Sequence, residues 1–248
     1  HRDLHSFPTR RSSDLPPWLG RFDASQKDRT AGSTQPYWGW LQSRLTGRQV
    51  SVLEARYDEA ISYADAYAGP FLQRALEILG PNTAIVVSAD HGESFAHGYG
   101  AHTGPGLYNE IVHVPLIIKL PAETAGSRCD APVQQADIAP TLAALAGVAA
   151  PADWEGHSLL GGCADTQPEA PQRAIFSMNF EQNPRFGALK TGSVAVIEGR
   201  WKFIHYMGAL HYPDMPRLHD ELYDVVADPG ERTDLAARSE ERRVGKEC

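Results

Sequence analysis

The chain has 248 residues, a formal net charge of −8, and 42% hydrophobic against 22% charged residues. This length allows one substantial domain, or a core with a smaller appendage. The acidic balance, and the absence of a Lys/Arg run between residues 16 and 237, exclude a nucleic acid or an anionic membrane as an expected partner, and no transmembrane run is visible. Neither a cellular location nor an oligomeric state follows from the sequence.

The two ends of the chain are unlike protein sequence. The first 15 residues, "HRDLHSFPTRRSSDL", back-translate into a string that resembles a widely used short-read sequencing adapter, and codons for 238–248 give the reverse complement of part of that string. We therefore expect both segments, 1–15 and 238–248, to be adapter-derived. They contain seven of the 23 Lys and Arg and five of the 31 Asp and Glu, so the remaining 16–237 carries a net charge of −10.

The first expected element is a helix that starts near residue 51. "SVLE" (51–54) fits a capping box with Ser51 as N-cap and Glu54 reaching back, and apolar residues then recur at helical spacing. The Gly-Pro pair at 69–70 is expected to kink or split this helix, because proline has no N–H for the turn behind it. A second Gly-Pro pair at 80–81 is expected to end it.

Two short apolar runs come next, "TAIVV" (83–87) and "VPLIIKL" (114–120). They lack polar alternation, which is typical of strands buried on both faces of a parallel sheet. Asp137 can cap a further helix, with Gly147 just past its end. These elements predict an α/β core over 16–165, with a mostly parallel central sheet flanked by helices.

The pattern changes after about residue 165. Alternating strands such as "SVAVIEG", "RWKFIHY" and "ELYDV" are separated by Pro/Gly loops. This spacing predicts a smaller antiparallel α+β subdomain over 166–237.

The stretch "SADHGESFAHGYGAH" (88–102) places Asp90 and His91 where the first strand must end. Ligands of open α/β sheets gather beyond the carboxyl ends of strands. Both side chains can bind one ion only if the chain turns between them, which Gly92 permits. A carboxylate and a neutral imidazole would supply half of a divalent-metal shell. On the motif alone, the equal alternative is that Asp90 caps the loop and His91 is an ordinary, partly buried histidine.

Several motifs in the same order resemble the sulfatase family of the alkaline-phosphatase superfamily. They are the Asp-His-Gly-Glu turn with its His-rich loop and "LYNE", then "VPLI", "ADIAPTLAALAGV" with "EGHSLL", and "RWKFI" with "ELYDVVADPGERTDLA". The resemblance covers 57–237 and implies an alkaline-phosphatase-like fold that is incomplete at its N-terminus. It also implies that the nucleophile, a formylglycine made from a Cys/Ser-x-Pro-x-Arg motif, lies upstream. "SFPTR" (6–10) fits that motif, but we expect a coincidence within the adapter segment.

The resemblance also implies roles for individual residues. Asp90 and His91 would be ligands of one divalent metal ion, with calcium expected first. Many members have Asn in place of His91 and usually hold calcium, so the histidine leaves manganese and zinc open as well. His102 would lie against the sulfate and the leaving group, where it would bind substrate and act as the catalytic proton donor. For His97 a loop-ordering role is favoured over substrate contact.

Other polar residues are expected to be structural or peripheral. His113 is expected to be packed, Lys119 to be a solvated strand end, and Asp137 to be a helix cap. Asp228 and Glu231 would belong to a turn. From the fold alone, His205 or His211 could line the pocket.

The function implied by the resemblance is hydrolysis of the sulfate ester of a small molecule or carbohydrate. The metal would neutralise the sulfate oxygens while His102 assists the leaving group. One alternative is a phosphoester or phosphonate hydrolase, or a phosphotransferase, of the same superfamily, because tetrahedral oxyanions of sulfur and phosphorus require similar sites. The other is an inactive truncated fragment, and we expect the chain as written to be inactive.

Overall fold

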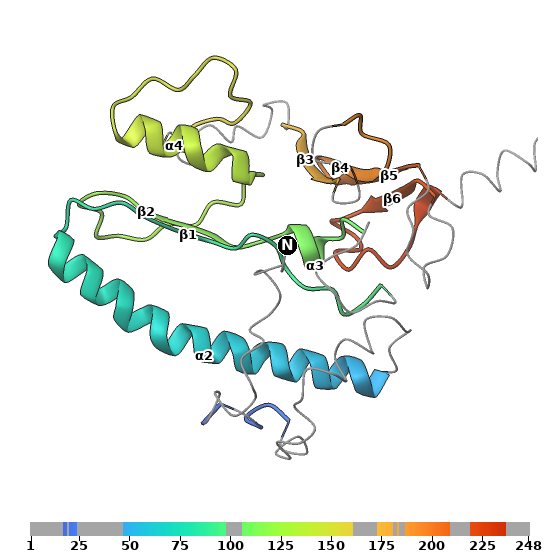
Figure 1. The fold of residues 1–248 in the computed structure, drawn as a ribbon, viewed down its shortest axis with the longest axis horizontal. Helices are drawn as coiled ribbons and strands as arrows, with labels where there is room; N and C mark the ends of the chain where they lie inside the picture. Colours follow the sequence, from blue (N-terminus) through green and yellow to red (C-terminus); the bar gives the residue numbers. More distant parts are fainter. Residues whose placement is uncertain are drawn as a thin grey trace, which may run out of the picture. The chain divides into compact units, whose positions relative to one another are not determined.

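The computed structural model describes residues 17–18, 20–23, 47–97, 106–160, 173–180, 183, 187–208 and 219–236 (Figure 1). The expected adapter segments, and the Ser6 motif with them, lie outside these residues. The chain divides into two compact units. Described residues up to 97 and those of 110–124 belong to the first unit, and those of 106–109, 125–208 and 219–236 belong to the second.

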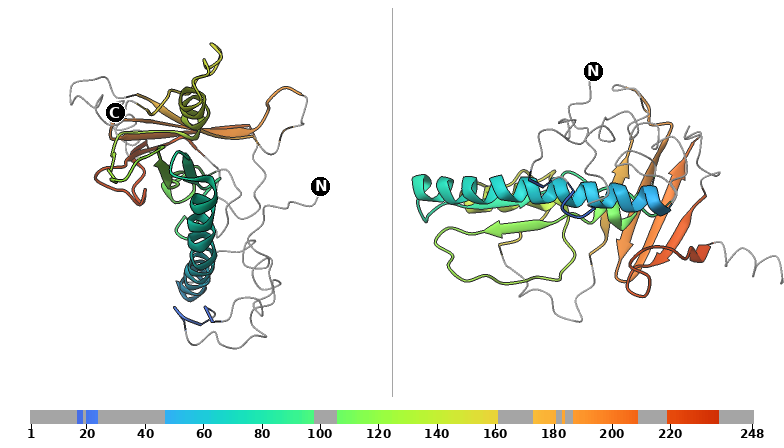
Figure 2. Two further views of the ribbon diagram at one scale, coloured as in Figure 1. Left: turned by 90° about the vertical axis from the view of Figure 1, so that its left-hand side faces the viewer. Right: turned by 90° about the horizontal axis from the view of Figure 1, so that it is seen from below.

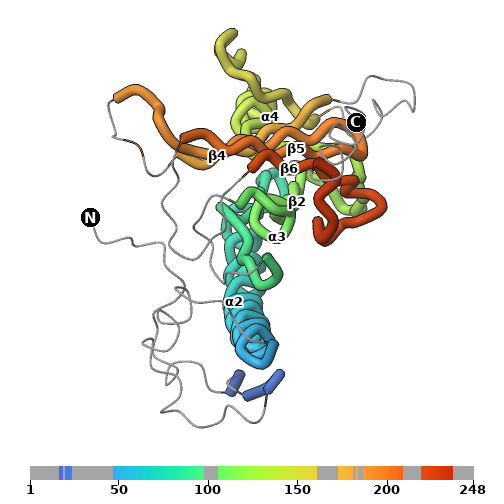
Figure 3. The backbone as a smooth tube through the Cα atoms, turned by 90° about the vertical axis from the view of Figure 1, so that its right-hand side faces the viewer, coloured from blue at the N-terminus to red at the C-terminus, as the bar shows by residue number. Residues whose placement is uncertain are grey.

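The first unit contains one long helix, α2 (Gly47–Leu79). It starts before the expected N-cap, and the Ser51 hydroxyl donates to the Gly47 carbonyl oxygen from inside the helix, so the capping-box prediction is wrong. The helix also continues through Pro70 without the expected split. Figures 1 and 3 draw α2 as one coil. Residues 64–70 are exposed, so water can satisfy the carbonyl that proline leaves unpaired. The expected end is confirmed: Gly80 has a φ of 83° and its N–H donates to the Leu76 carbonyl.

The two predicted core strands form β1 (Ile85–Ser88) and β2 (Leu116–Lys119). They pair with each other in antiparallel register, from Ile85 opposite Lys119 to Ser88 opposite Leu116. A mostly parallel central sheet is therefore not confirmed within the part of the chain that the structure describes. A continuous apolar run indicates burial but carries no information about strand direction, which is why the sequence did not show this pairing.

The second unit contains a four-stranded sheet with the order β3–β4–β5–β6, in which every neighbouring pair is antiparallel. Its strands are β3 (Ile175–Asn179), β4 (Gly192–Glu198), β5 (Trp201–Met207) and β6 (Glu221–Asp224), and Figure 2 shows them side by side. The antiparallel sheet expected for the C-terminal region is thus present. Along β5, Lys202 and Ile204 are buried while Trp201, Phe203 and His205 are exposed, the period-two pattern of a sheet with one covered face.

A buried ion pair lies on the covered face of this sheet. The Lys202 ammonium is 2.6 Å from Glu231 Oε1, and both side chains are at most 1% exposed. Lys202 also donates to Asn109 Oδ1 at 3.0 Å, and Glu231 Oε2 accepts the Asn109 backbone N–H at 2.5 Å. Glu231 does follow a turn, but this contact gives it a second and larger role that its position in "DPGE" did not indicate.

A second buried cluster joins two other motifs of the sequence. The Tyr108 hydroxyl donates to Glu221 Oε1 at 3.1 Å, and the Tyr223 hydroxyl donates to Glu221 Oε2 at 3.0 Å. The two rings also meet edge to face, with centroids 6.2 Å apart. Residues of "LYNE" and "ELYD", more than 100 positions apart, therefore share one packed contact.

Asp137 precedes α4 (Ile138–Leu145) as its N-cap residue and ends the short 3₁₀ helix η3 (Gln135–Asp137), but its side chain does not cap α4. Its carboxylate is fully buried and accepts two hydrogen bonds from the Arg173 guanidinium, each 2.9 Å long. Burial alone would raise the pKa of Asp137, but Arg173 and two backbone N–H groups lower it. The predicted helix cap is therefore wrong. Asp137 occupies the N-cap position of α4, but its carboxylate forms a buried ion pair instead of capping the helix.

The same carboxylate and a neighbouring hydroxyl hold the "EGHSLL" loop. Asp137 Oδ1 accepts the His157 N–H at 2.8 Å, and Thr141 Oγ1 accepts the Leu159 N–H at 2.9 Å. At Gly156 an added Cβ would lie 1.9 Å from the Ala136 carbonyl oxygen, so only glycine fits there. These contacts give a structural reason for the motifs "ADIAPTLAALAGV" and "EGHSLL".

Candidate functional site

The candidate site begins at the exit of β1. Asp90 and His91 follow Ser88, the last strand residue, after one intervening alanine. The Asp90 side chain is 72% exposed, and its Oδ1 accepts the His91 backbone N–H at 3.0 Å. Asp90 Oδ1 thus fixes the backbone at this point, while Asp90 Oδ2 faces the His91 imidazole.

The His91 ring has a defined orientation. Its Nδ1 is 2.8 Å from the Gly92 carbonyl oxygen. A carbonyl oxygen can only accept a hydrogen bond, so Nδ1 carries the proton and, in the neutral ring, Nε2 carries the lone pair. Nε2 lies 3.7 Å from Asp90 Oδ2. A backbone carbonyl that fixes the tautomer in this way is the usual outer partner of a metal-binding histidine.

These two donor atoms fit a divalent ion, because an oxygen and a nitrogen at this separation can both approach one metal. Within the described ranges, however, no group of three or more His, Cys, Asp and Glu side chains could hold a metal ion. A catalytic zinc site usually has three protein ligands, and calcium takes about 6–8 oxygens. The pair therefore accounts for part of a site.

Gly92 has a different role from the expected one. Its φ is not positive, so the chain does not need glycine for an unusual turn at this position. Instead, an added Cβ would lie 2.1 Å from the Glu110 carbonyl oxygen. The Gly92 N–H donates to the Ile111 carbonyl at 2.7 Å, and the next N–H, of Glu93, donates to the Glu110 carbonyl at 3.0 Å. Glycine is required because the two backbones approach closely.

Sequence reasoning assigned no role to Glu110, which lies in α3 (Asn109–Val112). Its Oε1 accepts from the Ser94 hydroxyl at 2.5 Å and lies 2.7 Å from His97 Nδ1, while Oε2 accepts the Phe95 N–H at 3.3 Å. The His97 side chain is 13% exposed. These contacts support the loop-ordering role of His97, which remains a proposal. The one signal in the sequence was the final Glu of "LYNE".

The charge of Glu110 follows from these contacts. Burial tends to raise its pKa, but the hydrogen bonds from His97 and Ser94 outweigh burial and lower it. Glu110 is therefore ionised at neutral pH and can only accept, so the proton of the short contact lies on His97 Nδ1.

The first turns of α2 support the same loop. The Tyr57 ring meets the Phe95 ring edge to face, with centroids 5.5 Å apart and an interplanar angle of 71°. Burial raises the pKa of the Tyr57 hydroxyl, and the negative charges of Glu93 and Asp58 raise it further. Tyr57 thus stays neutral and acts here as a packing residue.

The other residues with predicted roles agree with the structure in some cases and differ from it in others. His102, the expected proton donor, and His211 lie outside the described residues. His113 is exposed, so its expected packing is wrong. His205 is also exposed and pairs with Asp220 at 2.8 Å. Asp228 confirms the predicted turn, since its Oδ2 accepts the N–H groups of Arg232 and Thr233.

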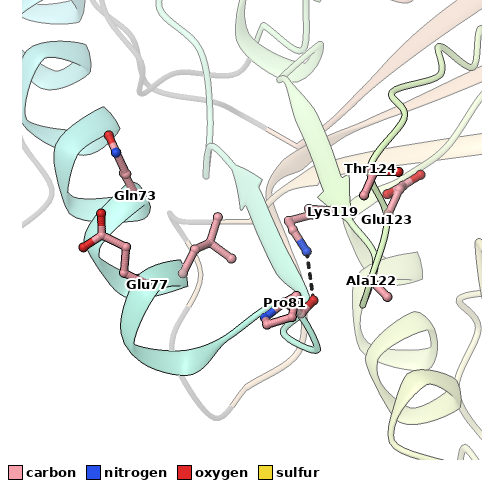
Figure 4. A pocket seen from close by; sticks show the side chains of 8 residues that line it. Gln73, Glu77, Pro81, Lys119, Ala122, Glu123 and Thr124 are labelled. Carbon is pink, nitrogen blue, oxygen red and sulfur yellow. Dashed lines mark hydrogen bonds between the residues drawn. The ribbon is translucent and has the colours of Figure 1, made fainter.

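A surface hollow of about 440 Å³ lies at the far end of the β1–β2 pair from the candidate site, where Lys119 pairs with Ile85 (Figure 4). Lys119 lies at this hollow, and its ammonium donates to the carbonyls of Thr83 and Leu120 at 3.1 and 3.0 Å, so it does more than end a strand in solvent. The lining residues are Gln73, Leu76, Glu77, Pro81, Lys119, Ala122, Glu123 and Thr124. None of them belongs to the candidate metal site.

Two protein-family models match the chain. The model "Sulfatase" matches residues 16–148, and "N-sulphoglucosamine sulphohydrolase, C-terminal" matches 99–248. Arylsulfatase K of Mus musculus is 25% identical over 225 residues, which cover 90% of this chain and 38% of that protein. The chain therefore spans well under half of this relative. Among the described helices, none combines the length and the apolar composition that a membrane crossing requires.

Two solved structures extend this comparison. The structure of BT4656 in complex with its substrate D-glucosamine-2-N,6-O-disulfate has a TM-score of 0.61 and 27% identity, and covers 91% of this chain and 44% of that chain. The phosphonate monoester hydrolase of Agrobacterium radiobacter has a TM-score of 0.62 and 26% identity, covering 80% of this chain and 40% of that chain.

Proposed function

Because the chain belongs to the sulfatase family, we propose that the protein hydrolyses sulfuric esters. We propose further that its substrate is a sulfated carbohydrate and that Asp90 and His91 form part of a divalent-metal site. The observation that carries this proposal is the 3.7 Å separation of Asp90 Oδ2 and His91 Nε2 at the strand exit. The substrate class is supported by the disulfated glucosamine bound to BT4656.

The metal site would use these two donors in a defined way. A bound divalent ion would neutralise charge on the sulfate oxygens. Asp90 would contribute a carboxylate oxygen and His91 its Nε2, with the Gly92 carbonyl holding the ring in the binding tautomer. Calcium is the ion that we propose first, because calcium prefers oxygen ligands such as the Asp90 carboxylate. Manganese and zinc are the alternatives, since zinc also binds an imidazole such as that of His91.

For the bond that breaks, we propose a division of labour between His102 and a nucleophile outside residues 16–237. One hydroxyl of a hydrated formylglycine would lose its proton and form a bond to sulfur, while the bond between sulfur and the ester oxygen breaks and its electron pair stays on that oxygen. His102 gives the departing oxygen its proton. Sulfate would then leave as the other hydroxyl loses its proton and the aldehyde re-forms. In this scheme His97 orders the loop that carries the metal ligands.

The alternative function is hydrolysis of a phosphonate monoester. It is favoured by one observation, the similarity to the Agrobacterium radiobacter hydrolase at a TM-score of 0.62. Both reactions place a tetrahedral oxyanion at the metal, so a likeness of fold at this level fits either one.

The test compares the two substrates in one protein. Because this chain spans only 44% of BT4656, the assay uses a chimera in which residues 16–237 replace the matching stretch of full-length BT4656. We expect this chimera to release sulfate from a sulfated glucosamine with a higher kcat/KM than it shows for an aryl phosphonate. A preference for the phosphonate, in a folded chimera and with unaltered BT4656 active beside it, would reverse the assignment.

A further inference from the structure

We propose that Glu110 is a positioning residue that clamps the loop 92–97 and thereby sets the orientation of the His91 ring. The proposal rests on the proposed role of Asp90 and His91 as metal ligands. It assigns to Glu110 no contact with substrate and no part in proton transfer to it.

The first part of the clamp is made by the backbone. The N–H groups of Gly92 and Glu93 donate to the carbonyls of Ile111 and Glu110 at 2.7 and 3.0 Å. The 2.1 Å between an added Cβ at Gly92 and the Glu110 oxygen shows how closely the two segments approach. The residue directly after His91 is therefore fixed to α3.

The second part is made by the Glu110 side chain. Its carboxylate accepts from Ser94 Oγ at 2.5 Å, from the Phe95 N–H at 3.3 Å and from His97 Nδ1 at 2.7 Å. One ionised group thus collects three donors from a four-residue stretch, and each of these is a charge-assisted hydrogen bond. Without the carboxylate, the three donors would lose their common acceptor.

The link to the metal ligands is the Gly92 carbonyl. This group accepts from His91 Nδ1 at 2.8 Å, and it belongs to the same peptide group as the Glu93 N–H, which donates to the Glu110 backbone carbonyl. A shift of the clamped loop would move this carbonyl away from the ring. The tautomer that presents Nε2 next to Asp90 would then lose its partner.

The experiment measures the chain itself, without metal or substrate, by NMR at one fixed pH at which His91 is neutral. Its variants are Glu110→Ala and Glu110→Gln, with Glu77→Ala as the matched control, because Glu77 is an exposed carboxylate of the same unit that pairs with Arg74 at the surface. Two quantities are recorded: hydrogen exchange of the Gly92, Glu93 and Phe95 amides, and the ring ¹⁵N shifts of His91 and His97.

For Glu110→Ala we expect loop amides to exchange about 10–100-fold faster, because the Ser94, Phe95 and His97 donors lose their charged acceptor. The His91 ring shifts should move from the Nδ1–H tautomer toward a mixture. Exchange at buried Ile204, in the other unit, should stay unchanged, which separates loop release from loss of the whole fold. Glu110→Gln keeps an acceptor of the same size and should restore most of the His91 signature.

The proposal would be overturned if Glu110→Ala left both the amide exchange and the His91 shifts at wild-type values. It would also fail if the His91 shifts were unchanged while the loop amides exchanged faster, since Glu110 would then order the loop without positioning the ring. Neither readout involves metal or sulfate. A failed sulfatase assay in the chimera would therefore leave this result unaffected.

Discussion

Replacing His102 by alanine in the chimera is expected to reduce the rate by about 10²–10⁴-fold for alkyl sulfates, the usual contribution of a general acid. An alkoxide is a poor leaving group and needs the proton that His102 would donate. Sulfates of acidic phenols leave without a proton, so their hydrolysis should fall much less. The measurement is kcat/KM for a series of sulfates with leaving groups of increasing acidity.

The control for this series is His113→Ala, because His113 is a nearby imidazole in the sequence that is exposed in the structure. It should leave all rates close to those of the parent chimera. An equal loss across the leaving groups in His102→Ala would contradict the acid role and would indicate simple binding of the sulfate group.

The largest expected effect on stability is that of Lys202→Met. Removing one partner of a buried ion pair leaves the other charge uncompensated, and the free energy of unfolding should fall by about 3–5 kcal/mol. Glu231 would be that charge, in a site where its side chain is 1% exposed. Denaturant unfolding of the chain, followed by circular dichroism, measures the loss.

A double variant distinguishes the pair from the packing around it. Burial lowers the pKa of Lys202 against the opposing attraction of Glu231, so the charged pair itself is not a strong source of stability. Lys202→Met combined with Glu231→Leu should therefore recover much of the loss. Lys190→Met, at an exposed lysine of the same unit, is the control. A Lys202→Met protein as stable as this control would show that the pair is not buried in solution.

Local signals in the sequence were sufficient to predict the structure where one residue type determines the backbone conformation. The end of α2 at Gly80, the turn held by Asp228, and the position of Asp90 and His91 at a strand exit were all predicted correctly. In each case the chemistry is local: a left-handed glycine, a carboxylate that accepts nearby N–H groups, and a strand that runs out of apolar residues.

Long-range partners were not predictable from the sequence. Lys202 lies in the alternating strand "RWKFIHY", at an inward position where a lysine is not expected. Its partners, Glu231 at 29 positions later and Asn109 in an earlier segment, explain its burial. Asp137 has the ordinary position of a helix cap, yet its carboxylate pairs with Arg173, which precedes β3. Glu110 was missed for the same reason, because its partners Ser94 and His97 show no periodic relation to it.

Metal binding by the folded chimera is the most direct test of the central claim, that Asp90 and His91 form part of the metal site of a sulfatase. Calorimetric titration with calcium, manganese and zinc would compare the parent chimera with Asp90→Ala and His91→Ala, and with Asp130→Ala at an exposed surface pair as control. We predict that each site variant binds its preferred ion at least about 100-fold more weakly, because loss of an outer partner alone costs about 10–100-fold. Unchanged affinity in both site variants would contradict the account.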